Sequence, residues 1–135
     1  MNHKHYTGVY TKTTEGIKVS VMPEYLDHSS DPERGLYMFA YTITIENLGE
    51  ASVQLLERHW MLNSGGETIA EIVGAGVVGE QPVLGSGGRF EYTSAAVIQD
   101  PEGSIEGMYV FRTDDGGFFE VMIPEFDLCS RIVFH

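Results

Sequence analysis

The chain has 135 residues, the size of one ordinary domain, and its 42% hydrophobic and 21% charged residues exclude a disordered protein. No apolar run reaches the ~20 residues that span a bilayer. Twenty acidic residues against eight scattered basic ones give a formal net charge of −12, which argues against binding to nucleic acid or to an anionic membrane.

Strand patterns fill the first half of the chain. The range 17–22 alternates apolar and polar residues, and a polar loop rich in structure breakers follows at 27–35. The strongest strand pattern covers 36–46, where aromatic and β-branched residues occupy one face. A further strand is predicted over 52–62, and the Asn and Gly residues of 63–66 predict a hairpin turn after it.

The second half continues in the same way, and no window has a sustained helical period. Its predicted strands are 68–73, 90–98, 108–112, 118–123 and an edge strand within 126–134. Short strands separated by turns predict an all-β fold, an immunoglobulin or fibronectin type III-like β-sandwich of about seven to eight strands, with a closed barrel as the alternative. We expect a single domain over 1–135 with a mobile N-terminal segment at 1–10. The residues predicted to be buried are Phe39, Tyr41, Ile43, Leu56, Trp60, Val110, Val121 and Ile123.

A glycine-rich segment, 74–82, matches the pattern G-x-G-x-x-G through Gly74, Gly76 and Gly79. A dinucleotide site would require a helix to begin there, but Pro82 disfavours helical angles in the residue before it, and no βαβ pattern surrounds the segment. We therefore predict a non-helical bend in which at least one glycine has a positive φ. A loop whose backbone N–H groups bind an anion remains the other interpretation.

The strand predicted over 52–62 contains a cation, an imidazole and an indole in consecutive positions, which are Arg58, His59 and Trp60. Arg58 and Trp60 share a face, while His59 points to the other side. Arg58 is suited to bind a carboxylate or a phosphate, although an ion pair within the protein is the simpler expectation. His59 is more often a packed or surface residue than a general base.

The sequence contains no recognisable catalytic or metal-binding constellation. His3, His5 and the acidic loop at 27–31 lack the spacing of zinc or calcium sites, so we predict no metal ligands, no catalytic residues and no cofactor. The single Cys129 excludes an internal disulfide and, with no apparent secretion signal, predicts a cytoplasmic protein.

Several segments resemble the ApaG family, and the resemblance covers nearly the whole chain. The matching segments are 39–47, 53–60, 74–82, 90–94, 103–109 and 119–128. The resemblance implies a fibronectin type III-like sandwich and a stand-alone bacterial cytoplasmic protein. Bacterial members are commonly labelled as cobalt and magnesium efflux proteins and are associated with diadenosine tetraphosphate hydrolase. Similar domains in eukaryotic F-box proteins and in a polymerase-delta-interacting protein look like binding modules. The stretch 85–88 departs from the family pattern because it lacks the usual Pro-Gly pair.

These observations lead to one functional hypothesis and one alternative. The hypothesis is a small cytoplasmic, non-enzymatic binding module that recognises a phosphate-bearing ligand or a protein partner through strand edges or the glycine loop, and whose oligomeric state the sequence leaves open. The alternative is an enzyme acting on nucleotide polyphosphates, with His59 or Glu80 as acid–base. The candidate ligand-binding residues are Arg58, His59, Gly74, Gly76, Gly79, Glu80 and Gln81.

Overall fold

The computed structural model describes residues 3–5, 8–130 and 132–134, and nearly all of their regular structure is β-strand. The strands are β1 (His3–His5), β2 (Tyr10–Thr14), β3 (Ile17–Tyr25), β4 (Tyr37–Asn47), β5 (Val53–Ser64), β6 (Glu67–Ala75), β7 (Val83–Leu84), β8 (Arg89–Ile98), β9 (Glu102–Thr113), β10 (Phe118–Met122), β11 (Phe126–Cys129) and β12 (Ile132–Phe134). Two 3-10 turns, η1 (Asp27–Ser29) and η2 (Pro32–Arg34), interrupt the predicted polar loop. Among the described residues, no helix has the length and apolar character needed to cross a membrane.

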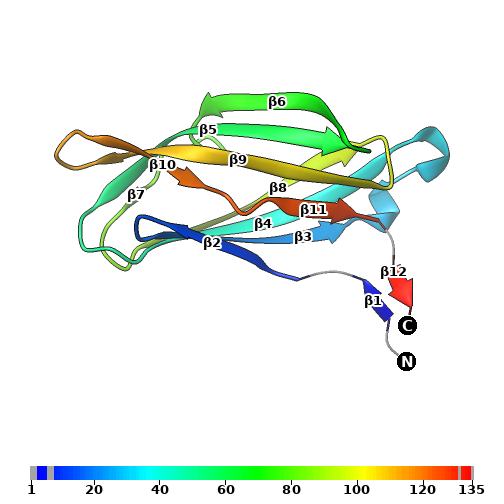
Figure 1. Cartoon of the computed structure of the whole chain (residues 1–135), viewed down its shortest axis with the longest axis horizontal. Coiled ribbons are helices and arrows are strands. Elements are labelled where there is room, and N and C mark those ends of the chain that lie inside the picture. Colours follow the sequence, from blue (N-terminus) through cyan, green and yellow to red (C-terminus); the bar gives the residue numbers. More distant parts are fainter. Residues whose placement is uncertain (1–2, 6–7, 131, 135) are drawn as a thin grey trace.

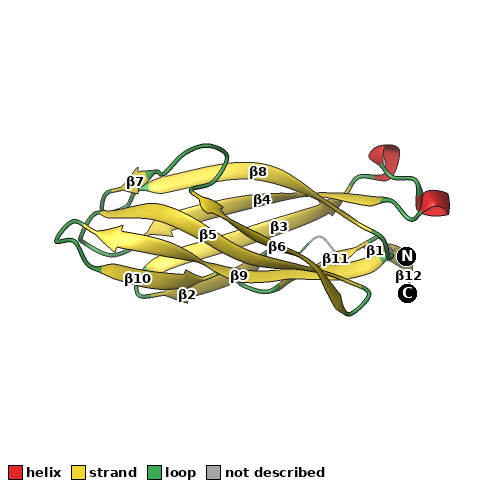
Figure 2. Ribbon diagram, turned by 90° about the horizontal axis from the view of Figure 1, so that it is seen from above, coloured by secondary structure: helices red, strands yellow, loops and turns green. Residues whose placement is uncertain are grey.

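Ten of these strands form two antiparallel sheets that pack face to face (Figures 1 and 2), while β1 and β12 form a separate two-stranded sheet. One sheet has four strands in the order β2-β3-β4-β8. The other has six, in the order β10-β9-β5-β6, with β11 also paired to β9 and β7 to β5. The predicted fibronectin type III-like β-sandwich is thereby confirmed, although ten strands form the two sheets instead of seven or eight. The additional strands include β2 and the two-residue β7, for which no strand was predicted.

The N-terminal segment, 1–10, is described only in part. Residues 1–2 and 6–7 lie outside the described residues, while β1 pairs with β12 at one end of the molecule (Figure 1). The mobility of this segment stays a prediction.

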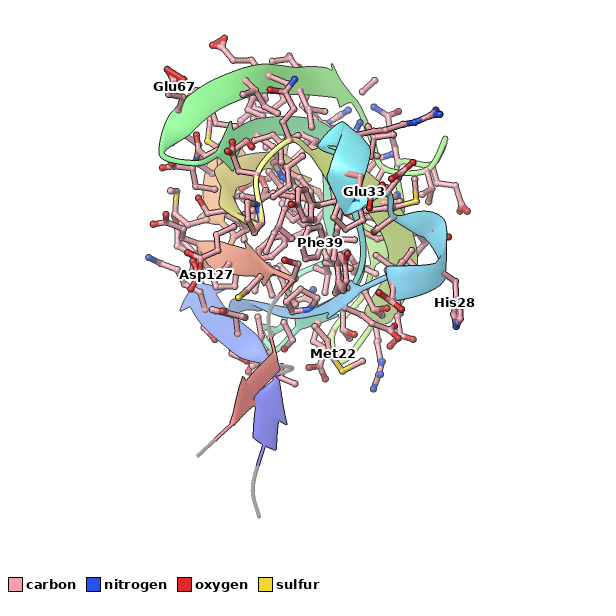
Figure 3. All side chains as sticks on the ribbon, turned by 90° about the vertical axis from the view of Figure 1, so that its right-hand side faces the viewer. Met22, His28, Glu33, Phe39, Glu67 and Asp127 are labelled. Atoms are coloured by element: carbon pink, nitrogen blue, oxygen red, sulfur yellow. The ribbon has the colours of Figure 1, made fainter. Side chains whose placement is uncertain are left out.

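Aromatic side chains fill the space between the sheets. Phe39 lies there, fully buried, as Figure 3 shows. Trp60 contacts Tyr41 and Tyr109 with ring centroids 5.6 and 5.9 Å apart, and Tyr41 also packs on Phe126. Such tilted ring pairs add roughly 0.5–1.5 kcal/mol each beyond the area they bury.

Six of the eight predicted core residues are buried, but the predictions for Leu56 and Val110 are wrong because both are only half-buried. A β-bulge in β5 explains the first. Leu55 pairs with Phe111 and Glu57 pairs with Val110, so Leu56 is an extra residue without a partner on β9. The inward face of β5 therefore changes parity at the bulge. Val110 lies between the buried residues Tyr109 and Phe111 on β9. Because side chains alternate along a strand, Val110 points to the outer face of the sheet.

Candidate functional site

The glycine loop is a tight, non-helical turn, as predicted. The N–H of Val77 donates to Glu80 O and the N–H of Glu80 donates to Val77 O, each at 2.8 Å. Gly76 and Gly79 have φ values of +66° and +80°, and Val78 between them has +43°. No helix begins in this segment, so the geometry of a dinucleotide-binding helix is absent from it.

Most of the loop's polar groups bond within the protein. The N–H of Gly76 donates to Leu56 O at 2.7 Å, and Gln81 Nε2 donates to the same oxygen at 3.0 Å. Gln81 O accepts from Gln54 Nε2. These bonds fasten the loop to β5 and leave fewer N–H groups for an anion than the sequence suggested, while the side chain of Glu80 is exposed.

Arg58 faces the interior, beside the start of the glycine segment. Its guanidinium carbon lies 5.7 Å from the centre of the Trp60 ring, and its Nε is buried without a hydrogen-bond partner. A Cβ added to Gly74, its partner in the β5–β6 register, would lie 3.7 Å from Arg58 Nη2. None of the ion pairs between described residues includes Arg58. The guanidinium is thus a cation without a counter-charge, next to a position that lacks a side chain.

Three buried phenols lie within the electrostatic influence of this cation. Tyr92 and Tyr109 join their hydroxyl oxygens at 2.6 Å. Burial raises the pKa of Tyr41, Tyr92 and Tyr109 above the ordinary value, and the positive charge of Arg58 offsets only part of that rise. The phenols therefore stay protonated at neutral pH and supply no anion to Arg58.

His59 lies on the opposite face of the sheet from Arg58. Its Nε2 is 2.8 Å from Glu57 Oε1, and both side chains are exposed to solvent. The structure therefore brings Arg58 and Gly74 together but separates His59 from them. Because Arg58 and His59 are consecutive residues of β5, His59 points away from the face on which Arg58 would hold a ligand.

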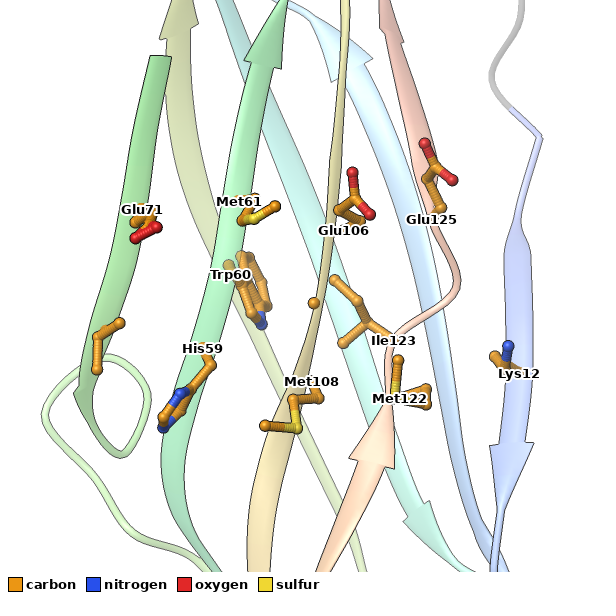
Figure 4. A pocket seen from close by; sticks show the side chains of 12 residues that line it. Lys12, His59, Trp60, Met61, Glu71, Glu106, Met108, Met122, Ile123 and Glu125 are labelled. Carbon is orange, nitrogen blue, oxygen red and sulfur yellow. The ribbon is translucent and has the colours of Figure 1, made fainter. Parts of the chain in front are cut away.

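A groove of about 490 Å³ lies on the outer face of the six-stranded sheet, and His59 is one of its lining residues (Figure 4). We call it the methionine groove, and its lining residues are Lys12, His59, Trp60, Met61, Glu71, Val73, Glu106, Gly107, Met108, Met122, Ile123 and Glu125. One cross-strand row of it is apolar except for the imidazole, and its members are the register partners Val73, His59, Met108 and Met122 on β6, β5, β9 and β10.

Carboxylates border this row. Glu71, Met61 and Glu106 form the neighbouring cross-strand row, and Glu125 adds a third carboxylate to the groove. Among these three acids, Glu106 accepts a hydrogen bond from Asn63 Nδ2 at 3.1 Å. Lys12 is the basic residue of the lining. The groove thus combines flexible, polarisable thioethers with an acidic border, a composition suited to binding other polypeptides.

Sequence reasoning missed this groove because its residues come from five strands. Met61 and Met108 read as ordinary strand residues, and only the register shows that Met108 stands opposite both His59 and Met122. In the part of the chain that the structure describes, no group of three or more His, Cys, Asp or Glu side chains is placed to hold a metal ion.

Comparisons with known proteins identify the family. A sequence model described as the ApaG domain matches residues 27–113. The chain belongs to the ApaG family. The chain is 50% identical to Protein ApaG of Nitrosomonas europaea over 119 residues, which cover 88% of this chain and 94% of that one. It is 44% identical to Protein ApaG of Dechloromonas aromatica with the same coverage. A solved structure of the ApaA protein of Bordetella pertussis is similar at a TM-score of 0.80 and 42% identity, covering 89% of this chain and 94% of that chain. The resemblance to ApaG proteins is confirmed.

Proposed function

We propose that this member of the ApaG family is a cytoplasmic, non-enzymatic binding module and that the methionine groove is its docking surface for a protein partner. The observation that carries the proposal is the apolar cross-strand row with its carboxylate border on an exposed sheet face. Val73 and Met122 in this row are 67% and 40% exposed, an arrangement that becomes favourable when a partner covers it. His59 contacts a carboxylate, and no hydroxyl or thiol of a described residue donates to it, which favours binding over catalysis.

A phosphate-bearing small ligand is the second candidate, because Arg58 has no counter-charge within the described residues. Arg58 and Gly74 would contact the ligand, with Gly79, Glu80 and Gln81 at the periphery. This candidate would connect the protein to the family's association with diadenosine tetraphosphate metabolism and with cobalt and magnesium homeostasis. Chemical-shift titration with a dinucleotide polyphosphate, with and without Mg²⁺, tests it, and shifts that do not include Arg58 would contradict it.

Site-specific photo-crosslinking in the native host tests the docking surface. A photoreactive residue replaces Val73 in the methionine groove or, as the matched control, Met22 on the outer face of the four-stranded sheet, where it is 47% exposed (Figure 3). We expect a discrete protein adduct from position 73 alone, which the purified partner reproduces. Equal adducts from both positions, or none from either, would refute a docking role for the groove.

A further inference from the structure

We infer that the partner binds as an added strand on the free edge of β6 and that it carries an acidic, an apolar and a basic residue in fixed positions. This inference rests on the proposed docking function and specifies its geometry and its partner chemistry. The partner is thus an extended protein segment with the pattern acidic–apolar–x–basic, running antiparallel to β6.

The edge of β6 is open for such pairing. Among the described residues, β6 pairs with β5 alone, through eight of its nine residues. A bulge places Ile69 outside the regular ladder, and from Ala70 to Ala75 the strand contains no proline and no basic residue. Exposed edges usually carry such residues to block pairing with other chains. Six regular residues, with Glu71 as the one charged side chain among them, therefore offer a template for another strand.

The backbone orientation follows from the register. Gly76 donates its N–H to Leu56 O, so it belongs to a hydrogen-bonded pair with β5. Alternation along an antiparallel ladder then turns the N–H and C=O groups of Glu71, Val73 and Ala75 away from β5. These groups point toward the position that a new strand would occupy.

Side chains on the outer face define two partner positions. A residue opposite Val73 would extend the apolar row that crosses His59 and Met108. A residue opposite Glu71 would face that carboxylate directly, which favours a lysine or an arginine at this position. In an antiparallel segment, the basic residue therefore follows the apolar one by two positions.

The inner face defines the third partner position. The residue opposite Gly74 precedes the apolar residue and points toward the interior, as Arg58 does. Gly74 has no side chain to cover Arg58 Nη2, and the guanidinium has no ion pair within the described residues. A carboxylate at this position would supply the missing counter-charge.

Two synthetic heptapeptides of equal composition test the inference on the intact protein. The first reads Thr-Thr-Glu-Leu-Thr-Lys-Thr, and in the second Glu and Lys exchange places. Both have the same net charge, so general attraction to an acidic protein affects them equally. We expect saturable binding of the first peptide, with amide shifts at Glu71, Val73 and Ala75 and methyl shifts at Val73, and about tenfold weaker binding of the second.

A matched pair of variants completes the test. Glu71→Lys should weaken binding of the first peptide about tenfold, whereas Glu67→Lys, the same charge change beyond the bulge, should leave it unchanged. Equal affinities for the two peptides, or shifts that map to β8, would overturn the inference. If position 73 yields a crosslinked partner but neither peptide binds, strand addition is wrong while the docking function stands. If position 73 yields no adduct, the docking function itself fails.

Discussion

Alanine replacements at the three glycines of the G-x-G-x-x-G match should differ sharply in stability. At Gly76 a Cβ would overlap the carbonyl oxygen of Glu80 and lie 2.9 Å from its carbonyl carbon, at a φ of +66°. At Gly79 the φ is +80° but no atom lies within 4 Å of the new Cβ. At Gly74 the φ is not positive, and the nearest contact is Arg58 Nη2 at an ordinary 3.7 Å.

The expected magnitudes follow from these contacts. Gly79→Ala incurs only left-handed strain of about 1 kcal/mol, partly offset by the lower entropy of the unfolded chain. Gly76→Ala has the same strain and must also open the turn between Val77 and Glu80, which breaks two hydrogen bonds worth about 1 kcal/mol each. The total is about 3 kcal/mol for Gly76→Ala, about 1 or less for Gly79→Ala, and a change within about 0.5 for Gly74→Ala.

Urea denaturation measures these differences. The only tryptophan, Trp60, is buried, so its fluorescence reports unfolding of the core. The three variants should share the wild-type m-value, since the surface exposed on unfolding is unchanged. If Gly76→Ala and Gly79→Ala lose equal stability, the turn is not held by the contact of position 76 with Glu80, and the reasoning fails.

Other perturbations probe the core, the phenols, the cation and metal binding. Trp60→Ala should lower the free energy of unfolding by about 3–5 kcal/mol, measured by urea denaturation followed by far-UV circular dichroism because this variant lacks the tryptophan probe. Burial raises the pKa of Tyr92 and Tyr109 in the folded state above the unfolded-state value near 10, so these phenols contribute their full stabilisation only below pH 10. As the pH rises from 10 toward the folded-state pKa values, the free energy of unfolding should fall by up to about 1.4 kcal/mol per pH unit for each phenol. Tyr92→Phe should flatten this slope in thermal melts from pH 8 to 12. Arg58→Met should keep the melting temperature, because the described residues give Arg58 no ion pair to lose; a marked decrease would mean that the charge stabilises the fold. Calorimetry with Co²⁺ or Zn²⁺ should show no stoichiometric binding at micromolar metal.

Local chemistry made much of the fold predictable. The long alternation in 36–46 determined β4, and Pro82 with its neighbouring glycines determined a turn instead of a helix. These features depend on residues adjacent in the sequence, whose backbone preferences act whatever the rest of the chain does. The same reasoning placed Arg58 and His59 on opposite faces, as the structure has them.

The bulge and the groove could not be predicted in this way. Nothing in the apolar run that includes Leu55 and Leu56 indicates which leucine is the extra residue, because both suit a buried strand equally. The choice depends on the pairing with β9, which lies more than forty residues away. The methionine groove depends on that same long-range register, and so its residues carried no signal before the strands were paired.

Long-range charge favours the protein partner over the polyphosphate. A net charge of −12 repels a polyphosphate before it reaches Arg58, and that repulsion acts over about a Debye length, ~8 Å at physiological salt. An extended segment with one acidic and one basic residue has no net charge to repel, so short-range contacts alone decide its binding. A polyphosphate would instead need a divalent cation to offset its charge. Only Gly74, which has no side chain, lies between Arg58 and the free edge of β6. A carboxylate on an added strand can therefore approach the guanidinium, whereas the net charge of the protein repels a highly charged ligand.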